Sequence, residues 1–177
     1  AARQRPGRAF ALVVRAADCV PMLIADTRTG AVAAVHAGWR GTAARVAVAA
    51  VEEMHRHFGT HAADLVVAIG PAIGPCCYEV GSDLVDAFAA AGHERYLIDR
   101  WFMTPRERRM RLDVAGGTPG QLLLPGGREA NGHPGGLSTS MHPDVLTPFR
   151  AGHSAARPRA GGDLGATGHP RVVTLIR

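Results

Sequence analysis

The sequence predicts a mixed α/β domain, and three observations support that prediction. Short apolar runs rich in Val, Leu, Ile and Ala, each bounded by turn residues, are typical of buried strands. Longer Ala-rich stretches with apolar residues at helical spacing separate these runs. A length of 177 residues with 46% hydrophobic content suits one ordinary domain, so we expect residues 1–177 to form a single domain with its own core.

The first elements are an apolar strand over Arg8–Val14 and a β-hairpin within Cys19–Gly41. The hairpin is predicted because two short apolar runs flank the turn residues Asp26–Gly30. Cys19 begins the first run and His36 ends the second, so a thiol and an imidazole can lie side by side at facing strand ends. Such a pair can share one metal ion or act as nucleophile and base, and spacing alone does not choose between them.

A helix is predicted after the hairpin. It begins at Thr42 as N-cap and ends at Phe58–Gly59, since the stretch is Ala-rich with helical spacing and Gly is a common C-terminal stop. The unpaired N–H groups at its start lie next to Arg40 and Gly41, and an anion can bind at such a position.

The next strand is predicted over Asp64–Ile69, followed by an irregular loop. Two Gly-Pro pairs in Gly70–Pro75 force a fixed loop conformation, and such loops position side chains or bring backbone near a ligand. The side chains that this loop positions are Cys76, Cys77 and Tyr78.

The last third of the chain has fewer regular signals. We expect a helix over Ser82–Ala91, a strand over Arg100–Asp113 that a charged turn interrupts, and a final strand over Arg171–Arg177. Residues 116–170 contain 13 Gly and 7 Pro, so we expect this Gly/Pro-rich portion to be poorly ordered.

Composition argues against several functional classes. The net charge of +5 comes from scattered Arg, and only 5% of residues are aromatic, which disfavours nucleic-acid binding. No apolar run reaches membrane-spanning length, no signal peptide is visible, and three Cys without regular spacing do not form a disulfide framework. We therefore expect a soluble cytoplasmic protein, and the missing initial Met suggests an N-terminally incomplete chain.

Three motifs occur in order: Ala17-Asp-Cys-Val-Pro21, His36-Ala-Gly-Trp-Arg-Gly41 and Gly70-Pro-Ala-Ile-Gly-Pro-Cys-Cys-Tyr-Glu-Val80. With them the chain resembles the YfiH/laccase-domain family, described first as polyphenol oxidases and later as purine nucleoside phosphorylases with adenosine deaminase activity. The resemblance implies an α/β (α+β) fold, a mixed β-sheet sandwich flanked by helices. It also implies phosphorolysis of adenosine, inosine, guanosine and methylthioadenosine, and deamination of adenosine.

The resemblance further implies a zinc site of one thiolate and two imidazoles, with Cys19 and His36 as two of the ligands. A zinc ion with such ligands and one open position lowers the pKa of bound water toward about 7, which suits deamination. The family's third ligand is a His well upstream, and no His precedes Cys19 here. We expect catalysis to involve Cys19, His36 and Arg40.

Substrate binding is assigned to the residues near these three. Phosphorolysis needs an anion beside the glycosidic carbon, and we assign its binding to Arg40 and Gly41. The pocket wall is assigned to Cys76, Cys77 and Tyr78.

The C-terminal third diverges from the family. The family has a Cys-Thr pair, an aromatic-Arg strand and a Thr-Gly-Arg turn, for which this chain offers Ser138-Thr139, Pro143–Arg150 and Thr167–His169. A Pro inside a central strand removes a ladder hydrogen bond. We therefore expect the Pro143–Arg150 strand to be an edge strand or absent.

Three alternatives to a zinc-dependent nucleoside enzyme remain open. Copper could replace zinc in a phenol oxidase, although only one Cys/His constellation is visible. Cys19 could be a nucleophile with His36 as its base in a cysteine hydrolase. The chain could also be a non-enzymatic remnant. We expect a purine nucleoside and phosphate as small-molecule partners, no nucleic acid, no membrane, and self-association through an exposed sheet edge.

Overall fold

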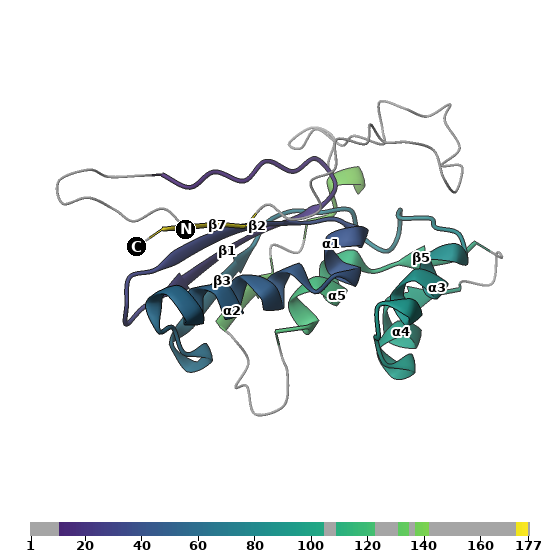
Figure 1. Ribbon diagram of the computed structural model, residues 1–177. Coiled ribbons are helices and arrows are strands. Elements are labelled where there is room, and N and C mark those ends of the chain that lie inside the picture. Colours follow the sequence, from purple (N-terminus) through teal and green to yellow (C-terminus); the bar gives the residue numbers. More distant parts are fainter. Residues whose placement is uncertain (1–10, 105–108, 123–130, 135–136, 142–172, 177) are drawn as a thin grey trace.

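The computed structural model describes residues 11–104, 109–122, 131–134, 137–141 and 173–176. A five-stranded sheet with the order β6-β3-β1-β2-β7 is its largest element (Figure 1). β1 is antiparallel to β2 and β3, and β2 is antiparallel to β7, whereas β3 and β6 run parallel. The predicted mixed α+β architecture is therefore confirmed. The strands are β1 (Val20–Asp26), β2 (Val32–Ala37), β3 (Leu65–Ile69), β6 (Asn131–Pro134) and β7 (Val173–Ile176).

The predicted hairpin is confirmed as β1 and β2, and its turn is held by a buried carboxylate. Asp26 is 2% exposed, and its Oδ1 accepts hydrogen bonds from the backbone N–H groups of Arg28 (2.8 Å) and Thr29 (2.9 Å). Burial acts to raise the pKa of Asp26, but the N–H groups and the hydroxyls of Thr29 and Thr60 outweigh it and hold that pKa well below its usual range. The charged carboxylate is thus part of the folded turn.

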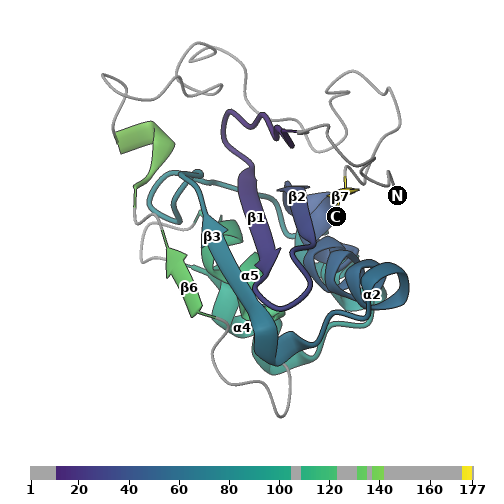
Figure 2. The same cartoon turned by 90° about the vertical axis from the view of Figure 1, so that its left-hand side faces the viewer.

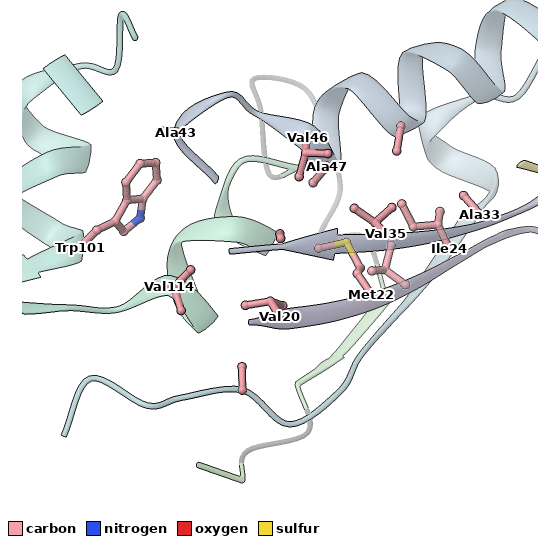
Figure 3. Packing of buried hydrophobic residues seen from close by; sticks show 14 of the residues in the cluster. Val20, Met22, Ile24, Ala33, Val35, Ala43, Val46, Ala47, Trp101 and Val114 are labelled. Atoms are coloured by element: carbon pink, nitrogen blue, oxygen red, sulfur yellow. The ribbon is translucent and has the colours of Figure 1, made fainter. Parts of the chain in front are cut away.

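The main core lies between the sheet and helix α2 (Val46–Phe58), which runs along one face of the sheet (Figures 1 and 2). Side chains of β1 and β2 alternate between the two faces, as the period of a strand requires. Figure 3 shows inward residues of both strands on the side of the sheet that α2 covers, with Val20 next to Val114. On the strands these are Val20, Met22, Ile24, Ala33 and Val35, all at most 2% exposed.

The helix predicted from Thr42 is two helices in the structure. The short α1 (Trp39–Ala43) comes first, and a left-handed residue, Arg45 (φ 54°), separates it from α2. The prediction of Thr42 as N-cap is wrong, because Thr42 lies inside α1 and its hydroxyl contacts the carbonyl oxygen of Gly38 (3.0 Å). The predicted end is confirmed, since Gly59 is left-handed and its N–H bonds to the carbonyl of His55.

A second group of elements packs against the end of the sheet near α1. The helix expected over Ser82–Ala91 is confirmed as α3 (Asp83–Ala90). The interrupted strand expected over Arg100–Asp113 is confirmed only as the short antiparallel pair β4 (Phe102–Met103) and β5 (Arg111–Leu112), because Arg100 and Trp101 belong to a helix. Helices α4 (Arg95–Trp101) and α5 (Val114–Gly120) were not expected. Aromatic rings hold this group together, with ring centroids 5.2 Å apart for Phe88 and Phe102 and 5.4 Å apart for His93 and Trp101.

Of the remaining sequence predictions, one strand is wrong, one strand is confirmed, and two segments cannot be compared with the structure. The described part of the Arg8–Val14 strand is irregular, and Val13 is 76% exposed, so the strand prediction is wrong for that part. The final strand is confirmed as β7. Two short 3-10 turns, η1 (Ala62–Asp64) and η2 (Thr139–Met141), complete the elements of the described residues. The expected segments Pro143–Arg150 and Thr167–His169 lie outside the described residues.

The expected poor order of residues 116–170 stays a prediction, since most of that stretch lies outside the described ranges. Within those ranges, no helix has the length and apolar character needed to span a membrane.

Candidate functional site

Cys19 and His36 lie where β1 begins and β2 ends. Pairing of Val20 with Ala37 and of Pro21 with His36 places His36 on the sheet face opposite the core, because Val20 and Met22 point inward. The Sγ of Cys19 lies over Gly38, only 2.8 Å from the position that a Cβ on that glycine would take. The hairpin register thus brings the thiol and the imidazole to neighbouring positions at one end of the sheet.

The ring of His36 is fixed by a backbone contact. Its Nδ1 lies 3.0 Å from the carbonyl oxygen of Arg15, and because a carbonyl only accepts, Nδ1 carries the proton. Nε2 then carries the lone pair that can bind a metal or accept a proton. A backbone partner of this kind is typical of histidines that bind metals, since it fixes both tautomer and ring orientation.

Arg40 and Gly41 follow in α1. The guanidinium of Arg40 lies over the ring of Trp39, 4.3 Å from the ring centroid, and the side chain is exposed. Gly41 is buried, and a Cβ there would lie 3.2 Å from Val46 Cγ1 and 3.5 Å from the carbonyl oxygen of His36. The small size of Gly41 therefore lets α1 pack closely against the end of β2.

The loop after β3 is bonded to the start of β1. The N–H of Gly70 donates to the carbonyl of Pro21 (2.9 Å), and that of Ile73 donates to the carbonyl of Asp18 (2.8 Å). The predicted fixed loop thus runs beside the Cys19 segment. Cys76 is exposed at its tip, Cys77 is half-buried, and Tyr78 is 8% exposed within the core cluster, so their assignment to a pocket wall stays a prediction.

The titration of Cys77 reflects its surroundings. Burial raises the pKa of its thiol, and the Cys76 thiol beside it raises that pKa further. The hydroxyl of Ser138 and the guanidinium of Arg111 act in the opposite direction. The net effect is a pKa of Cys77 above that of an ordinary thiol.

Sequence reasoning missed the role of the Ser138-Thr139 pair. Thr139 is 3% exposed, its hydroxyl donates to Oδ1 of Asp18 (2.8 Å), and its N–H donates to the carbonyl of Ala72 (3.0 Å). The N–H of Gly74 donates to the hydroxyl of Ser138 (3.1 Å). Three segments far apart in the chain are thus joined beside Cys19. The only sequence signal for this role was the correspondence of Ser138-Thr139 to the Cys-Thr pair of the family.

The described residues supply an incomplete donor set for zinc. Cys19 and His36 have suitable donor atoms on neighbouring positions, but no group of three or more His, Cys, Asp or Glu side chains is found within those residues. A zinc site with one open position needs three protein ligands. On the described residues alone, the fit is therefore incomplete.

The sequence matches a known family over most of its length. Residues 4–161 match the family described as multi-copper polyphenol oxidoreductase laccase. The chain belongs to this laccase family. The expected YfiH/laccase-domain membership is thereby confirmed.

Relatives of this laccase-family chain carry nucleoside-enzyme names. It is 35% identical over 133 residues to a purine nucleoside phosphorylase of Bacteroides thetaiotaomicron, covering 68% of this chain and 47% of that protein. It is 39% identical over 118 residues to adenosine deaminase RL5 of an unknown prokaryotic organism, covering 67% of this chain and 44% of that protein.

A solved structure agrees with the fold. The crystal structure of Bacillus licheniformis hypothetical protein YfiH aligns with a TM-score of 0.68 at 32% identity, covering 76% of this chain and 49% of that one. The chain spans about half the length of the relatives that it matches.

Proposed function

We propose that this member of the laccase family is a purine nucleoside phosphorylase that also deaminates adenosine. The names of its relatives support this proposal. The structural observation that supports the proposal most is the position of Cys19 and His36 at one end of the hairpin. Arg40 follows closely in α1. The proposed substrates are adenosine, inosine, guanosine and methylthioadenosine, with phosphate as co-substrate.

In phosphorolysis a phosphate oxygen attacks the anomeric carbon, the glycosidic C–N bond breaks, and the purine leaves with a proton as the free base. The proposed role of Arg40 is to hold the phosphate, because a guanidinium matches two phosphate oxygens with two parallel N–H groups. Trp39 supports that role by stacking under the guanidinium, which limits the orientations of its plane. Gly41 supports it by letting α1 lie close to His36.

The proposed cofactor is zinc, with Cys19 and His36 as two of its ligands. The hydrogen bond from His36 to Arg15 supports this assignment, because it leaves Nε2 as the donor atom. We assign no step of the reaction to zinc, since the described residues supply two of the three donors that such a site needs. Self-association and a cytoplasmic location stay predictions, and size-exclusion chromatography tests the first of them.

The first experiment measures zinc content per chain together with product release, using the protein and the variants Cys19→Ser, His36→Ala and Cys76→Ser. Adenosine is supplied with and without phosphate, while free purine base and ammonia are measured. We expect about one zinc per chain, phosphate-dependent base release, and loss of both in the first two variants, whereas Cys76→Ser keeps its zinc. A folded protein that releases neither base nor ammonia would overturn the proposal.

The family description favours one second candidate, oxidation of phenols with copper. It requires several clusters of His and Cys ligands, and no group of three or more His, Cys, Asp or Glu side chains is found in the described residues. Oxygen uptake with a phenolic substrate after copper loading separates this candidate from the nucleoside enzyme. A cysteine hydrolase would instead show rapid Cys19 alkylation in metal-free protein that substrate blocks.

A further inference from the structure

The exposed tip of the loop after β3 carries two adjacent thiols. Cys76 and Cys77 lie in one turn, in which the N–H groups of Cys77 (3.0 Å) and Tyr78 (3.2 Å) both donate to the carbonyl of Gly74. Further bonds from Gly70 and Ile73 attach the loop to the start of β1. The two thiols are therefore held on a fixed piece of backbone rather than on a free tail.

Ser138 contacts the more exposed of the two thiols. The Sγ of Cys76 lies 3.8 Å from Oγ of Ser138, and Cys77 follows Cys76 directly in the same turn. The N–H of Gly74 donates to Ser138 Oγ, so the proton of that hydroxyl remains available for a sulfur acceptor. A Cβ added at Gly74 would lie 3.1 Å from Cβ of Ser138 and 3.5 Å from Sγ of Cys76. Gly74, Cys76 and Ser138 therefore pack closely together.

The two sulfurs differ in exposure and in the charged groups near them. Arg111 of β5 acts to lower the pKa of the Cys77 thiol, but burial raises that pKa more. Cys76 is exposed whereas Cys77 is half-buried, so Cys76 is the sulfur that solvent and reagents reach first. An electrophile that bonds to Cys76 is thereby presented with a second sulfur next to it.

We propose that Cys76 and Cys77 together bind a soft metal or metalloid centre that takes two sulfur ligands. Trivalent arsenic is the example used to test the site. With an organoarsenic(III) oxide, two As–S bonds form, and the two thiol protons leave with the oxide oxygen as one water. Arsenic remains trivalent throughout, so the step needs no oxidant or reductant. The argument for this site does not rest on the proposed nucleoside chemistry.

The test uses phenylarsine oxide with the intact protein and mass spectrometry as the readout. We expect one adduct per chain that survives a monothiol and is removed by a dithiol, with loss in Cys76→Ser and in Cys77→Ser. Cys19→Ser is the matched control and keeps the adduct. Because Cys76 is exposed, Cys76→Ser is the variant that decides the outcome if Cys77→Ser does not fold.

Two results would overturn the proposal. One is a stoichiometric adduct that persists in Cys76→Ser; the other is no adduct in the protein although a maleimide labels Cys76. The variant Ser138→Ala gives a further test. Loss of the contact between Ser138 Oγ and Cys76 Sγ is expected to slow alkylation of Cys76 at neutral pH by about three- to tenfold. An unchanged alkylation rate in that folded variant would contradict the geometry on which the site rests.

Discussion

Replacing Gly38 with Ala is expected to destabilise the protein through a single contact with the Cys19 thiol. The added Cβ would lie 2.8 Å from Sγ, about 1 Å closer than the optimal separation of about 3.5–4.0 Å. The backbone of Gly38 (φ −83°, ψ −177°) suits any residue, so the cost comes from the contact alone. Overpacking of this kind costs about 1–3 kcal/mol.

A double-mutant cycle with Cys19→Ala isolates that contact. Without the sulfur, the new methyl group meets the Cβ of residue 19 at 3.8 Å, an ordinary van der Waals distance. The loss of unfolding free energy in urea should therefore be about 1–3 kcal/mol for Gly38→Ala alone and close to zero in the Cys19→Ala background. Losses that add within about 0.5 kcal/mol would refute the reasoning, because additivity indicates that the two groups do not touch.

Three further predictions concern stability. Thr139→Val removes the donor to the Asp18 carboxylate and should cost about 1–3 kcal/mol in urea unfolding, whereas Thr139→Ser keeps it; equal losses would contradict the hydrogen-bond account. The pKa of Asp26 is lowered by folding, so its contribution is present above about pH 4 and lost as pH falls through the folded pKa; Asp26→Asn should lack this acid-dependent loss in unfolding free energy. Burial lowers the pKa of His93, whose Nε2 donates to the carbonyl of Ala43 (2.8 Å), and its contribution is therefore present above about pH 6.5 and lost as pH falls through the folded pKa. His93→Gln should flatten this dependence, and an unchanged profile would show that His93 does not titrate on unfolding.

Strand periodicity and turn residues were sufficient to predict the hairpin, β3, α3 and β7 from sequence. These elements are determined by local patterns: alternation in β1 buries Val20, Met22 and Ile24, and Gly59 and Gly92 stop their helices in the left-handed conformation. The resemblance to the laccase family rested on motifs within the same part of the chain.

Local pattern failed where contacts between distant segments decide the conformation. Arg45 adopts a left-handed conformation, and the hydroxyl of Thr42 lies 2.7 Å from that of Thr118 in α5. Neither feature can be inferred from spacing within one helix, so the break between α1 and α2 was missed. Over the described residues 11–14, the Arg8–Val14 prediction failed for a related reason, because an apolar run forms a strand only where a partner strand is available.

The sequence by itself determined the family, the hairpin and the adjacency of Cys19 and His36, because motif order and strand register are properties of the chain. Only the tertiary structure decided which distant groups meet there. It placed Thr139 on Asp18, Ser138 beside Cys76 and Cys19 over Gly38. The physical reason is that side-chain hydrogen bonds and close contacts between remote segments depend on how the sheet and its loops pack, which no local periodicity encodes.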